Sequence, residues 1–152
     1  MTLRTRLADK LADSSPSLLV VSDSFVGSLL ANDFDAKGDA HLVTDREGVA
    51  SRVSDSVQTT VGNLTGPHTL GAAADADIAV IDLQQDRQTL LVAQLLRTRF
   101  DINSLVVVLN DPQRHEALDG VATDIVCRTT CLSTALSDTL ERGLPESTNS
   151  HS

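Results

Sequence analysis

The sequence has 152 residues, a hydrophobic fraction of 41% and a formal net charge of −9. A chain of this length fits one domain and can bury a core, and its composition is too apolar for a disordered protein. Its acidity argues against DNA or RNA as a partner, because a phosphate-binding surface requires clustered Lys and Arg. Aromatic residues make up only 2%, so the core must be built from aliphatic side chains.

The acidic charge is carried mainly by Asp, and the only lysines are Lys10 and Lys37. Charge self-repulsion of this kind keeps a protein soluble in salt, so we expect a cytoplasmic protein of a salt-loving organism, with an ordinary acidic protein as the alternative. No segment approaches the roughly 18 apolar residues of a membrane span, so contact with a membrane would need a partner. Cys127 and Cys131 are too few for a disulfide framework, and we expect no metal site.

The first predicted element is a short amphipathic helix over residues 2–13, where Leu3, Leu7 and Leu11 recur every four residues. After it, apolar runs rich in β-branched residues alternate with helical patterns. Strands are predicted at 18–21, 41–43, 59–61, 78–81, 105–109 and 124–127, and helices roughly at 26–33, 47–54, 67–74, 86–100, 112–118 and 131–142.

Continuous apolar strands separated by helices are typical of a parallel sheet with helices on both faces. Six strands in two sets of three predict an α/β, Rossmann-like, doubly wound parallel sheet. We therefore expect an N-terminal helical extension over 1–16, a Rossmann domain over 17–143 and a disordered polar tail over 144–152.

Two of the predicted helices carry apolar stripes. The longest, 86–100, is expected to bury Leu91 and Leu95, together with Val92 and Leu96. The last, 131–142, is expected either to cover the sheet or to serve assembly with the side chains of Leu132, Ala135, Leu136 and Leu140.

The bend after the first strand stands where a dinucleotide fold has its phosphate-binding glycines. Those glycines allow a tight turn, let the backbone approach the pyrophosphate and let the helix pack closely on the strand. Gly27 fits the third role, whereas Ser22 and Ser24 replace the first two glycines and lose their easy access to positive φ. Asp23 adds a carboxylate where a phosphate would lie. We therefore expect a reduced anion affinity, although the helix N-terminus still offers N–H groups.

Asp45 follows the second strand, 18 residues beyond Gly27, which is about where a carboxylate accepts hydrogen bonds from a ribose diol. Its alternative role is the N-cap of the predicted helix 47–54. Arg46 follows directly and is expected either to contact a ribose phosphate or to be solvated.

The segment ADIAVIDLQQ also resembles the phosphoacceptor strand of a response-regulator receiver, with Asp82 as the acceptor and Asp23 as a magnesium ligand. A receiver also needs a lysine at the end of its fifth strand, where Asn110 and Asp111 stand here. Motifs of hydrolases and metalloproteases are missing from the sequence, and its histidines are scattered. We therefore expect no enzymatic activity and no catalytic residues, with an NAD-linked enzyme as a minor alternative.

Over residues 17–142 the chain resembles the TrkA N-terminal domain family, also called the N-lobe of RCK domains, which regulates potassium transporters and channels. The motifs that carry the resemblance are LLVVSDSFVGSLLA, HLVTDR, VGNLTGPHTL with ADIAVI, and NDPQRHEAL. The resemblance implies a domain that binds NAD or an adenine nucleotide and transmits this state to a potassium transporter or channel subunit. It also implies a homodimer or a higher homo-oligomer.

The chain departs from the family pattern on the ligand side. Two of the three loop glycines are replaced, Asn63 stands where the family has an acid beside the adenine, and Leu90 stands where an Asn is usual. We also expect no counterpart of the family's C-terminal ligand-binding lobe. The packing pattern, in contrast, is intact.

These observations predict a regulatory nucleotide-binding domain with a degenerate phosphate loop. The alternative is a ligand-free scaffold or dimerisation module that docks to a transporter or another partner. In the first case the loop would hold phosphate, Asp45 the ribose, and Asn63 would lie beside the base. The residues expected to bind the nucleotide are Ser22, Ser24, Phe25, Val26, Gly27, Asp45, Arg46, Asn63, Leu64 and Asp82.

Overall fold

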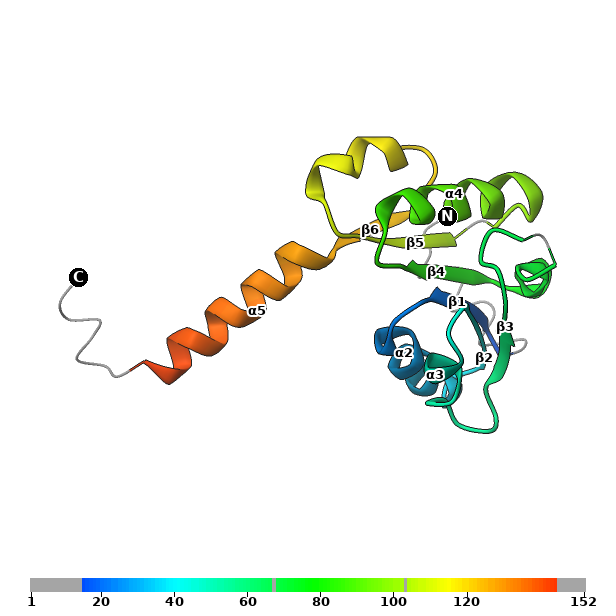
Figure 1. Cartoon of the computed structure of the whole chain (residues 1–152), viewed down its shortest axis with the longest axis horizontal. Coiled ribbons are helices and arrows are strands. Elements are labelled where there is room, and N and C mark those ends of the chain that lie inside the picture. Colours follow the sequence, from blue (N-terminus) through cyan, green and yellow to red (C-terminus); the bar gives the residue numbers. More distant parts are fainter. Residues whose placement is uncertain (1–14, 67, 103, 145–152) are drawn as a thin grey trace.

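A parallel β-sheet forms the centre of the computed structural model, which describes residues 15–66, 68–102 and 104–144 (Figure 1). The sheet has six strands in the order β3-β2-β1-β4-β5-β6, and every neighbouring pair is parallel. This confirms the predicted α/β, doubly wound sheet. The strands are β1 (Ser17–Ser22), β2 (Asp39–Thr44), β3 (Gln58–Val61), β4 (Ile78–Asp82), β5 (Ser104–Leu109) and β6 (Asp124–Cys127).

Helices follow the strands in alternation, as the sequence pattern predicts. Most of the predicted extension over 1–16 and of the predicted tail over 144–152 lies outside the described residues. The helices are α2 (Phe25–Asp35), α3 (Glu47–Ala50), α4 (Asp86–Arg99) and α5 (Arg128–Gly143), and two 3₁₀ helices are η1 (Gly71–Asp75) and η2 (Pro112–Leu118).

The two faces of the sheet carry different helices. On one, called here the α2 face, Leu42 and Val20 pack with Ala31 of α2 and Val49 of α3. On the other, the α4 face, a larger cluster joins the sheet to α4, η1 and η2. The buried members of both clusters are aliphatic, as the scarcity of aromatic residues predicts. The α4-face cluster includes Leu19, Ile81, Val92, Leu96, Val107 and Leu118.

Helix α4 packs on the sheet through most of the predicted stripe. Val92 and Leu96 are buried as expected, together with Ala93, and the partly buried Leu95 packs against the same cluster. The prediction is wrong for Leu91, which is 49% exposed and lies on the outer side of the helix.

Three predicted helices are shorter or tighter than expected. Helix α3 ends at Ala50, and the hydroxyl of Ser51 donates to the carbonyl of Gly48 at 2.9 Å. Serine side chains compete in this way for the backbone groups that would continue a helix. The predicted helices 67–74 and 112–118 are instead the 3₁₀ helices η1 and η2.

Helix α5 projects away from the sheet (Figure 1). Every residue from Thr129 to Leu144 is exposed, so the expectation that this helix covers the sheet is wrong. Its leucines form a stripe in which the exposed fractions of Leu132, Leu136 and Leu140 are 56%, 54% and 66%. Neither α5 nor any other helix in the described part of the chain combines the length and apolarity that crossing a bilayer requires.

One half of the α2 face lacks a cover among the described residues. Side chains alternate along a strand, so Val80 of β4, Val106 and Val108 of β5, and Val126 of β6 point to this side. Val126 is 40% exposed, and the other three are partly exposed. We call these four residues the valine face.

Candidate functional site

The predicted site residues all lie at or after the carboxyl ends of strands, so they gather at one edge of the sheet. The strand order reverses between β1 and β4, which is where ligands bind in open α/β sheets. We call this edge the switch-point edge. Ser22, Ser24, Phe25, Val26 and Gly27 end or follow β1, Asp45 and Arg46 follow β2, Asn63 and Leu64 follow β3, and Asp82 ends β4.

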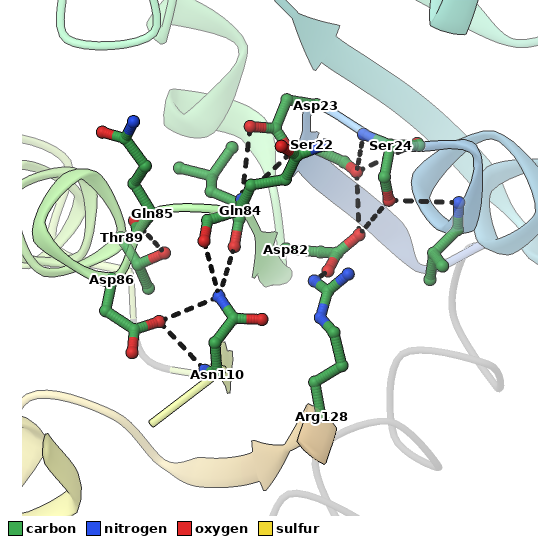
Figure 2. Close-up of polar contacts among 12 residues, drawn as sticks. Ser22, Asp23, Ser24, Asp82, Gln84, Gln85, Asp86, Thr89, Asn110 and Arg128 are labelled. Atoms are coloured by element: carbon green, nitrogen blue, oxygen red, sulfur yellow. Dashed lines mark hydrogen bonds and ion pairs between the residues drawn. The ribbon is translucent and has the colours of Figure 1, made fainter. Parts of the chain in front are cut away.

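The bend after β1 is organised around the carboxylate of Asp82 (Figure 2). The hydroxyl of Ser22 donates to Asp82 Oδ2 at 3.0 Å, and the hydroxyl of Ser24 donates to the same oxygen at 2.8 Å. Ser22 and Asp82 are neighbours in the β1–β4 register. The two serines that replace glycines therefore bind a carboxylate of the protein itself.

The second oxygen of this carboxylate has a cationic partner. Arg128, the first residue of α5, forms an ion pair with Asp82 Oδ1. The side chain of Asp82 is 2% exposed and that of Arg128 is 28% exposed. A buried carboxylate requires a counter-charge and hydrogen-bond donors, and Arg128 with the two serines supplies both.

The backbone N–H groups of the bend are also engaged within the protein. In a phosphate-binding loop such groups point at the anion. Here four of them donate to internal acceptors, so few remain for a ligand. The N–H groups of Asp23, Ser24, Val26 and Gly27 donate to Asp82 O, Ser22 Oγ, Ser24 Oγ and Ser24 O, respectively.

Gly27 is required by the close approach of α2 to β1. A Cβ atom built on Gly27 would overlap Cβ and Oγ of Ser22 far inside van der Waals contact. The glycine thus keeps its packing role. Its close partner is a serine side chain, which directs its hydroxyl to Asp82.

A second polar network adjoins the first and joins β4 to β5 (Figure 2). The carboxylate of Asp23 accepts from the N–H of Gln84 at 3.1 Å. The buried carboxylate of Asp86 accepts from the backbone N–H and the side-chain amide of Asn110, at 2.9 and 3.0 Å. A shallow cavity of about 440 Å³ opens beside Asp86 and Asn110 and is flanked by Arg87.

Asp45 and Arg46 lie beside the bend and are exposed. The structure rules out Asp45 as the N-cap of the following helix, because that position is held by Arg46, whose side chain makes no capping hydrogen bond. Nη1 of Arg46 donates to the carbonyl of Asp23 at 3.3 Å. Both side chains are therefore at the switch-point edge, and Arg46 contacts the bend from the β2 side.

Asn63, which was expected beside a base, and two other predicted site residues have contacts within the protein. The side-chain oxygen of Asn63 accepts from the N–H and the hydroxyl of Thr65, at 3.1 and 2.9 Å, which forms a local turn. Leu64 is buried in the α4-face cluster. Phe25 is exposed and stacks on the guanidinium of Arg52 at 4.4 Å.

The start of α5 also carries a perturbed thiol. Hydrogen bonds from the hydroxyls of Thr129 and Thr130 stabilise the thiolate of Cys127 and lower its pKa. In the described part of the chain, no three His, Cys, Asp or Glu residues are grouped so that they could hold a metal ion.

Arg128 is the residue of this site that the sequence interpretation missed. Its position contained a signal, because it directly follows the last parallel strand, whose carboxyl end lies at the same edge as the bend. Asp82 was expected at the site as a ligand contact. In the structure Asp82 accepts from both serines of the bend and pairs with Arg128, and its role as a ligand contact stays a prediction.

The sequence matches a known family over the parallel sheet and the β1–α2 bend. The TrkA-N domain family matches residues 18–129. This chain belongs to the TrkA-N domain family. The matched residues include the bend, both polar networks and Arg128.

Solved structures show the same fold at low sequence identity. The NAD(P)-binding domain of an exopolyphosphatase-related protein from Archaeoglobus fulgidus is 15% identical, with a TM-score of 0.68, over 82% of this chain and 97% of that one. The TrkA-N domain of the inner membrane protein YbaL from Escherichia coli is 12% identical, with a TM-score of 0.69, over 84% of this chain and 98% of that one. The GsuK channel bound to NAD is 18% identical, with a TM-score of 0.62, over 75% of this chain and 22% of the channel chain. None of the curated protein sequences matches the chain.

Proposed function

We propose that this chain is a non-enzymatic regulatory domain of the TrkA-N type, linked to potassium transport, that works without a bound dinucleotide. The observation that carries this proposal is the ion pair between Arg128 and buried Asp82, with Ser22 and Ser24 donating to the same carboxylate. A pyrophosphate at this bend would face the carboxylates of Asp82 and Asp23. It would also have to displace the internal acceptors of the loop N–H groups.

The link to transport rests on family membership and on the likeness of this fold to the GsuK channel. In this function the domain lies on the cytoplasmic side and reaches the membrane through a transporter or channel subunit. Helix α5 is the candidate assembly element, because its leucine stripe projects from the domain and is exposed. We propose that this stripe joins copies of the chain into a homodimer or higher homo-oligomer.

A second candidate function is weak binding of NAD or an adenine nucleotide. The exposed carboxylate of Asp45 favours it, since this carboxylate is free of the capping role and lies on the β2 side of the switch-point edge. In that case Asp45 would hold the ribose, and the remaining N–H groups near Phe25 would contact phosphate.

Titration of the purified protein at high salt with NAD, NADH, ATP and ADP separates the two functions. A ligand at 100 times its dissociation constant stabilises by roughly 2.7 kcal/mol, which for a domain of this size is a shift of about 6–10 °C in melting temperature. We expect no shift with any of these nucleotides at millimolar concentration. A saturable shift would support the nucleotide-binding function and contradict the nucleotide-free one.

The assembly role is tested separately by Leu136→Asp, with Thr134→Asp as a control on the opposite side of α5. Both variants add the same charge to an exposed position, and surface substitutions usually change stability by only about 0.5 kcal/mol. Only Leu136→Asp is expected to reduce the molar mass measured by light scattering after size-exclusion chromatography. Equal masses for both variants would exclude the leucine stripe as the assembly surface.

A further inference from the structure

The valine face requires a cover that the described helices do not provide. Parallel sheets are found with both faces packed against other elements. Val106 and Val108 belong to neither hydrophobic cluster of the described residues, although their neighbours Leu105 and Val107 lie in the α4-face cluster. Val80 and Val106 are directly opposite in the register, as are Val108 and Val126, so the four side chains form one continuous apolar surface.

We infer that the N-terminal segment, residues 2–13, folds as an amphipathic helix onto the valine face of its own chain. This inference does not depend on whether the bend binds a nucleotide. It concerns the surface of β4, β5 and β6, which reaches the switch-point edge at Val108, opposite Asp82 in the register. The segment carries its leucines in one stripe at Leu3, Leu7 and Leu11, which is the pattern of a helix that buries one side.

The place where this segment joins the sheet also favours the valine face. Pro16 is fixed in place, because its carbonyl accepts from the N–H of Asp39 at 2.9 Å, and β1 begins at the next residue. Leu18 of β1 lies directly opposite Ile78 of β4 in the register. Residues 2–13 are therefore joined to the amino end of β1, which neighbours β4 of the valine face, by only residues 14–16.

The other surfaces of the sheet near Pro16 are already covered by helices. Helices α2 and α3 cover the β1–β3 half of the α2 face, and α4 with the two 3₁₀ helices covers the opposite face. A helix over residues 2–13 would be about 18 Å long. A strand of six residues such as β5 is about 20 Å long. The segment can thus run back along β4 and β5 and place its leucines over Val106 and Val108.

The charge of the segment fits a surface element of this protein. It contains Arg4, Arg6 and Lys10 beside Asp9 and Asp13, whereas the whole chain has 21 acidic and 12 basic residues. A locally cationic helix is attracted to an acidic domain. The competing occupant is helix α5 of a second copy, whose leucine stripe is also apolar and exposed.

Protection of a single thiol at the valine face distinguishes these occupants. Val106→Cys is introduced with Cys127→Ser and Cys131→Ser in the full chain, and alkylation of the introduced thiol is followed at several protein concentrations. Leu7→Asp is then added, with Thr5→Asp as the matched control on the opposite side of the segment. We expect Leu7→Asp to raise the alkylation rate by about tenfold, as for the loss of a locally stable element. Thr5→Asp should leave it unchanged, and protein concentration should have no effect.

Disulfide trapping gives the second measurement. Leu3, Leu7 or Leu11 is replaced in turn by Cys in the Val106→Cys background, with Leu29→Cys in place of Val106→Cys as the control, since Leu29 is 66% exposed on α2. We expect at least one pair to close within the chain and to run as a compact monomer on non-reducing gels. Failure of all three pairs overturns the inference. Protection of the thiol introduced by Val106→Cys that is lost on dilution or with Leu136→Asp also overturns it and assigns the valine face to α5 of a second copy.

Discussion

Arg128 and Asp82 join the first residue of α5 to the last residue of β4 through an ion pair at the switch point of the sheet. The pair connects two features that would otherwise be independent, namely the state of the bend and the direction in which α5 leaves the domain. An anion that bound at the switch-point edge would compete with Asp82 for Arg128. The ion pair is therefore the point at which a ligand and an assembly helix would act on each other.

Arg128→Ala is expected to destabilise the domain, because it leaves the buried carboxylate of Asp82 without a counter-ion. The free energy of unfolding in urea should fall by about 3 kcal/mol, near the low end for breaking a buried ion pair, since the Arg128 side chain is partly exposed. The double variant Asp82→Asn/Arg128→Ala should recover part of this loss, because no charge remains buried. Arg114→Ala, which breaks an exposed pair with Asp111, is the control and should cost at most about 1 kcal/mol. A double variant no more stable than Arg128→Ala would contradict the argument.

Asp82→Ala is expected to open the bend to anions. It removes the carboxylate and frees the guanidinium of Arg128 and the hydroxyls of Ser22 and Ser24 to bind a ligand. Millimolar ADP or NAD should then raise the melting temperature of the variant, whereas the unmodified protein should not respond. Restoring the family loop with Ser22→Gly, Asp23→Ala and Ser24→Gly should add affinity only when Asp82 is also replaced. If the loop variant binds equally well with Asp82 present, the carboxylate is not what closes the site.

Gly27→Ala is expected to be strongly destabilising, because its new Cβ would overlap the side chain of Ser22. The companion variant Gly27→Ala/Ser22→Gly removes the obstructing atoms and should restore most of the lost stability in urea unfolding. Gly48→Ala in α3 is the control. A Cβ there meets no atom within 4 Å, and alanine is favoured over glycine in a helix by about 1 kcal/mol. Without recovery in the double variant, steric overlap with Ser22 would not be the reason for the glycine.

His41 is expected to make the stability of the domain fall in mild acid. Burial lowers its pKa, opposed by a hydrogen bond with Gln58, and its Nε2 lies 2.7 Å from the hydroxyl of Thr60. The unfolded chain, with a His pKa of about 6.5, therefore binds a proton more readily than the folded one as the pH falls through 6.5 and below. Stability is thus highest above this value and decreases below it. His41→Gln should flatten the dependence of the unfolding free energy between about pH 5 and 7. An unchanged slope in His41→Gln would contradict the prediction.

The sheet and its order could be predicted because the strands are continuous aliphatic runs. Val20, Ile81 and Val107 lie in continuous apolar runs rich in β-branched residues, which are typical of the strands of a parallel sheet. The position of the site followed from the same pattern, since the carboxyl ends of parallel strands meet at one edge. The exposure of Leu91 could not be read from the sequence, because α4 has apolar residues on more than one side. The rotation of α4 about its own axis is set by the packing of Val92 and Leu96 on the sheet.

The internal closure of the site could not be predicted, because it depends on side chains that are far apart in the sequence. Ser22 and Asp82 are 60 residues apart, and Arg128 comes from a third segment. The sequence showed that glycines had been replaced by serines and that acidic residues lay nearby. It did not show that one of these acids would accept from both serines. That pairing depends on the register of β1 against β4, which only the folded sheet defines.

The long separation between the partners of Asp82 has a consequence for how the chain folds during synthesis. When β4 leaves the ribosome, β1 and its serines are already available, but the cation that neutralises Asp82 has not yet been made. A chain that ends before Arg128 is therefore expected to leave Asp82 without its counter-charge and to be less stable than the whole protein.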